Sequence, residues 1–313
     1  MSDSTLLRTL QAASHLADTL PPAASLDALR YGLNTARAAA PSGDAWRALV
    51  EKHVRPHPAV AVALESPFVH RCFSKPRGYA GDAVMLDFIY RHPANQALAR
   101  QATPRGRALM DACLTTPAPR AVRNRCRLLA DEIDSVCIRN PRAEILSLAC
   151  GHLREAEHSA ALGAGTFKRF LAMDQDLESL AMVARDHGPL GIKAQTGSVK
   201  TVITHGAAEL GSFDFIYAAG LYDYLSDRVG VRLLNTLFSM LKPGGKVWIA
   251  NFALNIDDAG FMEAIMDWWL IYRDAIALRT MADNAFADLE NVTSVQTFEE
   301  TERNVVFLEA VKA

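Results

Sequence analysis

A glycine and an acid stand about 20 positions apart, in a pattern that suits a bound nucleoside. Gly151 follows the apolar run of residues 145–149, and helix-forming residues come directly after it. Asp174 ends a second apolar run, residues 170–173, and precedes another helical stretch. The glycine would let a ligand approach the backbone, and free N–H groups at the helix start would face that ligand. A carboxylate at this spacing is the group that accepts the hydroxyls of a ribose.

The turn around Gly151 lacks two glycines of the usual G-x-G-x-G spacing. Ala149 stands before Gly151 and Leu153 after it, where the pattern has glycine. An ordinary turn between a strand and a helix therefore stays open as an interpretation. Asp174 also has a second interpretation, in which it only caps the following helix, although Asp176 could do that instead.

Small residues follow two later apolar runs of the sequence. Ser198 comes after residues 192–195, where an adenine edge would lie, although it suits a helix cap equally well. The run of residues 213–218 leads into Ala218-Ala219-Gly220, against which a ligand can lie. The residues expected to contact the ligand at all these turns are Ala149, Gly151, Asp174, Gln175, Ser198, Val199, Ala219 and Gly220.

Residues 141–313 alternate between strand-like and helical stretches, which would bring these turns to one edge of a sheet. The strand candidates are residues 145–149, 170–173, 192–195, 213–218, 246–252 and 305–311. This alternation predicts an α/β fold with a doubly wound, mainly parallel sheet. Residues 1–140 show helical periodicity, with helices expected from Ser4, Ser25, residues 41–44 and residues 120–136, and therefore predict an N-terminal helical domain or cap.

One stretch of the helical region, residues 72–90, breaks the helical pattern. Pro76, Gly78 and Gly81 interrupt any helix, and Tyr79 lies between the two glycines. One interpretation is a tight corner between two helices that the tyrosine packs. The other is a functional loop that lays Tyr79 over a ligand.

The composition suits a globular protein of the cytoplasm. The chain has 313 residues, 50% of them hydrophobic, and a formal net charge of −2. It shows no electrostatic footprint for nucleic acid and no membrane-spanning run, and the basic cluster at residues 123–127 indicates a solvated helix face. Five scattered cysteines suggest neither a disulfide frame nor zinc. No metal site is predicted, because Pro56 breaks any helix that would align His53 with His57.

The order of these motifs resembles that of class I S-adenosylmethionine-dependent methyltransferases. The resemblance covers about residues 140–252, and the sequences FDFIY, at residues 213–217, and LKPGG, at residues 241–245, are its most specific parts. KPRGYAGD, SLACGHLREAE, GLYDYL, IANF and DWWLIYR extend it over almost the whole chain. They are similar to a bacterial branch that includes 3-hydroxypalmitate methyl ester biosynthesis proteins and enzymes that cyclise S-adenosylmethionine to azetidine-2-carboxylate. The resemblance implies a Rossmann-like methyltransferase fold, S-adenosylmethionine as cofactor, and Asp174 as the ribose ligand.

With that cofactor, further polar residues gain expected roles. Arg154 and Glu155 are expected to meet the methionyl carboxylate and ammonium, unless they are two surface charges. Asp223 is expected to orient an amine, and Asn251 to offer both a donor and an acceptor, unless it only ties down its own loop. The candidate catalytic residues are Tyr79, Asp223, Tyr224 and Asn251.

Aromatic residues gather in a segment at about residues 257–282, which we expect to form a helical lid. Trp268, Trp269, Tyr272 and Arg273 lie in this segment, and Tyr222 is expected to join the same wall. Aromatic faces attract a sulfonium cation, and a closed site excludes water. The alternative is that the tryptophans pack in a core.

Three functions remain open from the sequence. The first is methyl transfer to a small carboxylate or amine in secondary or signalling metabolism. The second is intramolecular cyclisation of S-adenosylmethionine, with release of 5′-methylthioadenosine. The third is a cofactor-binding protein without catalysis. A small molecule is the expected partner, and the sequence leaves open a homodimer.

Overall fold

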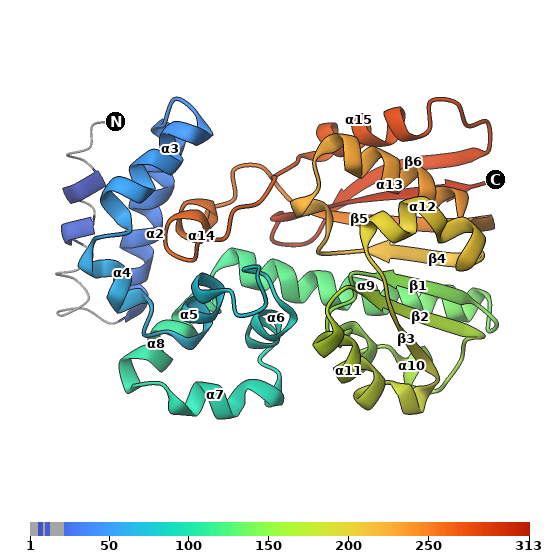
Figure 1. Cartoon of the computed structure of the whole chain (residues 1–313), viewed down its shortest axis with the longest axis horizontal. Coiled ribbons are helices and arrows are strands. Elements are labelled where there is room, and N and C mark those ends of the chain that lie inside the picture. Colours follow the sequence, from blue (N-terminus) through green and yellow to red (C-terminus); the bar gives the residue numbers. More distant parts are fainter. Residues whose placement is uncertain (1–5, 9, 13–21) are drawn as a thin grey trace. The chain divides into compact units, whose positions relative to one another are not determined.

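The computed structural model describes residues 6–8, 10–12 and 22–313 (Figure 1). The helix expected from Ser4 lies largely outside these residues. The chain forms two compact units. A helical unit contains Met1–Arg120 and Asn255–Leu270, and a sheet unit contains Ala121–Leu254 and Ile271–Ala313. The boundary differs from the expected one near residue 140, because most of the helix that precedes the first strand belongs with the sheet.

The sheet unit contains seven strands in the order β3-β2-β1-β4-β5-β7-β6 (Figure 1). They are β1 Glu144–Leu148, β2 Arg169–Asp174, β3 Ile192–Thr196, β4 Phe213–Ala218, β5 Leu241–Phe252, β6 Val292–Glu299 and β7 Val305–Lys312. The first five are parallel, and β7 runs antiparallel to both β5 and β6. The prediction of an α/β fold with a doubly wound, mainly parallel sheet is confirmed.

Two features of the sheet differ from the expectation. Strand β6 was not predicted, because it lies at the edge and its side chains are exposed or half-buried, so its sequence carries no apolar run. The sequence Pro243-Gly244-Gly245 precedes the predicted strand of residues 246–252, but in the structure it is a bulge inside β5. A Cβ atom at Gly245 would lie 2.9 Å from the carbonyl oxygen of Phe213, so only glycine fits there.

Helices and short helical turns connect the strands of the sheet unit. They are α9 Pro117–Arg139, α10 Ala160–Gly163, α11 Leu177–Asp186, α12 Val199–Glu209, α13 Asp227–Ser239 and α15 Ala275–Ala285, with the short turns η3 Arg154–Glu157, η4 Gly188–Leu190 and η5 Tyr222–Tyr224. Helix α11 packs on β2 and β3, while α13 contacts both α12 and α15. Helix α9 starts with Pro117, which suits a first helical turn because proline lacks an N–H group.

The helical unit consists of short helices with well-formed ends. They are α2 Pro22–Ala39, α3 Gly43–Leu49, η1 Val50–Val54, α4 Pro58–Ala63, α5 Pro67–Ser74, α6 Ala83–Ile89, η2 Pro93–Asn95, α7 Gln96–Gln101, α8 Pro104–Cys113 and α14 Ala259–Ala264. The side chains of Ser42, Ser66, Asp82 and Thr103 each accept a backbone N–H at a helix start. Helix α2 starts at Pro22, three residues before the Ser25 that the sequence suggested. Within the described ranges, no helix is both long and apolar enough to cross a membrane.

Two buried acids fix the segment Asn255–Leu270 within the helical unit. Asp258 accepts a hydrogen bond from Arg30 Nε at 2.5 Å, and Glu263 accepts one from the Trp46 indole N–H at 2.7 Å. Helix α14 also approaches α2 closely, because a Cβ atom at Gly260 would lie 2.7 Å from the backbone nitrogen of Asn34. A segment far along the chain thus completes the helical unit.

The Gly260→Ala substitution should lower the free energy of unfolding by about 1–3 kcal/mol, because an added methyl group would overpack two helix backbones. Urea denaturation measures this change. Gly43→Ala is the matched control: it adds a methyl group at the start of α3 with no atom within 4 Å, and its stability should be unchanged or slightly higher. Equal stability of the two variants would contradict the close packing of α14 on α2.

Candidate functional site

The turn after β1 adopts a glycine-like backbone even where it lacks glycine. Ala149, Gly151 and Leu153 have φ values of 55°, 53° and 54°, all in the left-handed region. For alanine and leucine this conformation costs about 1–2 kcal/mol each relative to ordinary backbone. Such cost persists only where the surrounding structure imposes it, and it gathers at functional sites. The positions expected to hold glycine therefore keep the shape of a G-x-G-x-G turn.

No long helix follows this turn, contrary to the sequence interpretation. Residues Arg154–Glu157 form one turn of 3-10 helix, and α10 has only four residues. The long helix whose first N–H groups were expected to face the ligand is therefore not present after this turn.

Asp174 ends β2 beside this turn and is 7% exposed. Its Oδ2 accepts the backbone N–H of Gly151 at 2.8 Å, and its Oδ1 accepts that of Asp176 at 2.9 Å. Asp176 instead caps α11, by accepting the N–H of Glu178. Each oxygen of Asp174 retains a second lone-pair site, so the carboxylate is held in place and can still accept hydroxyl groups.

Arg154 and Glu155 are buried, so they are not surface charges. Tyr217 Oη donates to Glu155 Oε1 at 2.8 Å, and burial raises the pKa of Glu155. Arg154 donates to Glu157 Oε1 at 2.6 Å and lies 3.4 Å from Asp186 Oδ2. The two neighbours therefore have separate surroundings: Glu155 is bonded to β4, while Arg154 is engaged with acids of η3 and α11.

Arg125 is the residue of this site that sequence reasoning missed. It was assigned to a solvated helix face, but its side chain is 5% exposed. Its Nη1 donates to the carbonyl oxygen of Ala219 at 2.5 Å, and a Cβ atom at Gly220 would lie 3.9 Å from both of its terminal nitrogens. The helical pattern held a signal, because Ala121, Arg125 and Leu129 share one face of α9 and the other two are buried.

Asp223, Asn251 and Arg273 form one network at the ends of β4 and β5. Asp223 accepts the backbone N–H of Phe252 at 2.7 Å. Asn251 donates to the carbonyl oxygens of Phe252 and Ile271, and its Oδ1 accepts from Arg273 Nη1 at 2.8 Å. These bonds match the alternative in which Asn251 ties down its own loop. Its catalytic role stays a prediction.

The remaining predicted residues of the sheet unit lie at the carboxyl ends of its strands or beside them. Ser198 accepts the N–H of Thr201 and so caps α12, where Val199 is the first residue. Gln175 is exposed directly after Asp174. Tyr222 is fully buried, whereas Tyr224 is 40% exposed. Tyr272 is half-buried, between two residues of the network above.

Tyr79, Trp268 and Trp269 belong to the helical unit. Tyr79 is half-buried in the loop between α5 and α6, whose two sides are joined by a bidentate ion pair between Arg71 and Asp82 at 2.8 Å. Lys75 of the same loop forms an ion pair with Asp267, and the Trp269 indole also donates to Asp267. The structure thus connects the loop of Tyr79 with the aromatic segment, as parts of one unit. Trp268 is 6% exposed, as a core residue would be.

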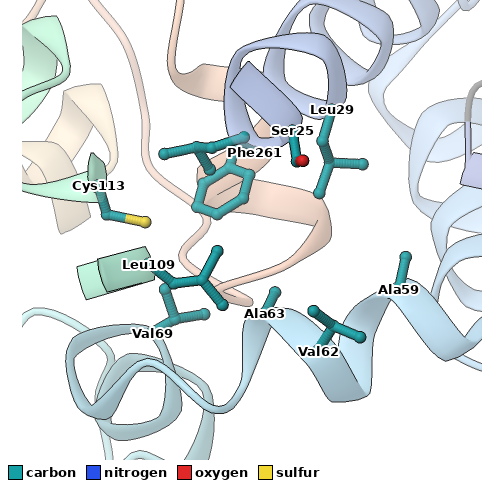
Figure 2. A pocket seen from close by; sticks show the side chains of 10 residues that line it. Ser25, Leu29, Ala59, Val62, Ala63, Val69, Leu109, Cys113 and Phe261 are labelled. Atoms are coloured by element: carbon teal, nitrogen blue, oxygen red, sulfur yellow. The ribbon is translucent and has the colours of Figure 1, made fainter. Parts of the chain in front are cut away.

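The helical unit also encloses an apolar cavity, which Figure 2 shows from close by. Side chains of α2, α4, α5, α8 and α14 line it, among them Leu29, Ala63, Leu109 and Phe261. Its volume of about 30 Å³ holds about one water molecule, so it is far too small for a nucleoside.

The chain is similar to several solved structures. A possible exported protein from Bordetella parapertussis is 15% identical with a TM-score of 0.53, over 81% of this chain and 96% of that one. Magnesium protoporphyrin IX methyltransferase from Synechocystis PCC 6803, with bound SAH, is 12% identical with a TM-score of 0.44, over 63% and 87%. The TehB-like SAM-dependent methyltransferase from Corynebacterium glutamicum is 18% identical with a TM-score of 0.41, over 61% and 88%. The first likeness shows the fold alone, and the other two are weaker. No protein-family model matches the chain, and no curated protein matches its sequence.

The left-handed turn predicts opposite effects of two glycine substitutions. Ala149→Gly should leave stability unchanged or raise it by about 1 kcal/mol, because glycine relieves the backbone cost and loses only a methyl group. Leu153→Gly should lower stability by about 2 kcal/mol, because Leu153 is 1% exposed and its removal leaves a cavity. Thermal unfolding measures both. A clear loss of stability in Ala149→Gly would show that the turn is not strained at that position.

The free energy of unfolding should depend on pH because of Asp223. Burial raises its pKa from the ordinary 3.8 to about 6, against the lowering effect of the Phe252 N–H and of Arg125 and Arg273. The folded state thus binds the proton more tightly than the unfolded state, so the stability that this proton provides is complete below pH 4 and is lost as pH rises through 6. The stability of the wild type should fall relative to that of Asp223→Asn by roughly 1–3 kcal/mol between pH 4 and 7. Urea denaturation across this range tests it, and parallel curves would contradict the shift.

Proposed function

We propose that the sheet unit binds S-adenosylmethionine and that the protein is a methyltransferase. The observation that carries the proposal is the strained turn Ala149–Leu153 with the carboxylate of Asp174 fixed beside it. In open α/β sheets, ligands bind outside the carboxyl ends of the strands where the strand order reverses. Here that point lies between β1 and β4, which are adjacent parallel strands.

The residues of this edge suit the parts of the cofactor. Asp174 would accept the ribose hydroxyls, and the turn at Gly151 would let the nucleoside lie close to the backbone. Ala219 and Gly220 carry little or no side chain after β4, so that the sulfonium side of the cofactor can pass there. S-adenosylmethionine supplies an activated methyl group on a sulfonium, and the protein would add proximity and alignment, which are worth about 7–11 kcal/mol of the barrier.

We further propose that the acceptor is a small carboxylate or amine, as the resemblance implied. The roles that the sequence suggested for Tyr79, Trp268 and Trp269 stay predictions, as do the catalytic roles of Asp223, Tyr224 and Asn251. A homodimer and a cytoplasmic location are also part of this proposal. Each of these proposals rests on the sequence.

Binding tests the proposal first. Isothermal titration calorimetry should show that the wild type binds S-adenosylmethionine and S-adenosylhomocysteine. Asp174→Ala should weaken both by about 2–4 kcal/mol, because two charge-assisted hydrogen bonds to the ribose are lost. Asp176→Ala is the matched control, since it removes an acid two positions away that caps α11. Equal losses in the two variants, or no binding by the wild type, would reject the assignment.

Product analysis separates transfer from cyclisation. With S-adenosylmethionine alone, a methyltransferase should form no product, and S-adenosylhomocysteine should accumulate only when a small acid or amine is added. Mass spectrometry identifies the methylated acceptor. Stoichiometric 5′-methylthioadenosine and azetidine-2-carboxylate without any acceptor would instead assign the cyclase reaction, while leaving the cofactor site intact.

A further inference from the structure

The most unusual charged group of the sheet unit is the guanidinium of Arg125. It lies 5% exposed at the carboxyl end of β4, where Nη1 donates to the carbonyl oxygen of Ala219. A guanidinium carries five N–H donors, and burying such a charge is costly unless it is paired. Across residues 22–313 and the described residues before them, no other hydrogen bond and no ion pair of Arg125 is present.

Arg273 is a second buried arginine of the same unit, and its hydrogen bonds can be compared with those of Arg125. It is equally buried, at 3% exposed. Its nitrogens donate to the carbonyl oxygens of Tyr222 and Leu225, to Asn251 Oδ1 and to Asp227 Oδ1. Its charge and its donors are therefore satisfied by the fold. Arg125 has one bond where Arg273 has five, so the fold alone does not account for its burial.

The surroundings of Arg125 are those of an amino-acid site. Arg125 lies close enough to two buried acids, Glu155 and Asp223, to lower the pKa of each against the raising effect of burial. Glu155 is held by Tyr217 and Asp223 by the N–H of Phe252. One guanidinium and two fixed carboxyls at one sheet edge offer partners for a carboxylate and for an ammonium group.

We propose that Arg125 binds the carboxylate of the methionyl group of the cofactor, the role that the sequence had suggested for Arg154. This rests on the proposed function. Arg154 is less suited, because Glu157 and Asp186 already engage it. Arg125 is further suited because Gly220 beside it carries no side chain, and a planar guanidinium can hold a carboxylate by two parallel hydrogen bonds.

Two ligands that differ in the methionyl group test this assignment. S-adenosylhomocysteine carries the carboxylate and the ammonium group, whereas 5′-methylthioadenosine keeps the nucleoside and the thioether but lacks both. Calorimetry with Arg125→Gln should show S-adenosylhomocysteine binding weakened about 10- to 100-fold, with 5′-methylthioadenosine binding unchanged. Arg125→Lys should recover part of the loss, since it keeps the charge but not the paired hydrogen bonds. Arg127→Gln, on the exposed part of the same helix, is the matched control and should bind both ligands as the wild type does.

The other outcomes overturn the assignment in distinct ways. Equal weakening of both ligands by Arg125→Gln would mean that Arg125 only supports the fold of the site. Unchanged binding of both would mean that the carboxylate lies elsewhere, and a raised KM for an acidic acceptor in that variant would place the acceptor there instead. Failure of the wild type to bind either ligand would reject the proposed function itself.

Discussion

The carboxylate of Asp174 stabilises a turn in which Ala149 and Leu153 adopt the unfavourable left-handed conformation. Parallel pairing aligns Leu148 of β1 with Met173 of β2, so Asp174 arrives beside the turn in the next position of the register. Its two hydrogen bonds join the backbone after β1 to the backbone after β2. Two left-handed positions without glycine cost about 2–4 kcal/mol together, which this buried carboxylate helps to offset. The same group that would hold a ligand is thus needed to shape the surface that the ligand would meet.

The second constraint is the set of charged side chains that meet beside the neighbouring strand β4 and its carboxyl end. Tyr217 pairs with Ser147 of β1 and reaches Glu155 beyond it, while the backbone after β4 accepts a bond from Arg125. These groups come from four parts of the chain, and they meet only because β1 and β4 are neighbours. Burial raises the pKa of Glu155 and Asp223, and the positive charge of Arg125 acts on both in the opposite direction.

The sequence predicted the parallel strands well because they are buried on both faces and read as apolar runs. Strand β4 was predicted to the residue, and Asp174 was located by its spacing from Gly151. Strand β6 lies at an edge, where half-exposed side chains give no such run. The segment Asn255–Leu270 could not be assigned to the helical unit either. Its place depends on single contacts of Asp258 and Glu263 with residues more than 200 positions earlier, and no local pattern records them.

The candidate site shows the same limit at the level of single side chains. Chemistry and spacing indicate which groups reach the carboxyl ends of the strands, and Asn251, Asp223 and Glu155 all do so. Chemistry and spacing do not indicate which of these groups already have all their hydrogen bonds within the folded protein. Asn251 has its donor and its acceptor engaged by the segment around Arg273, whereas Arg125, in a cluster of basic residues that resembled a solvated face, is buried with one hydrogen bond. A polar group can bind a ligand only with the hydrogen-bond sites that the rest of the protein leaves unused. Which sites are unused depends on contacts that form only in the folded chain.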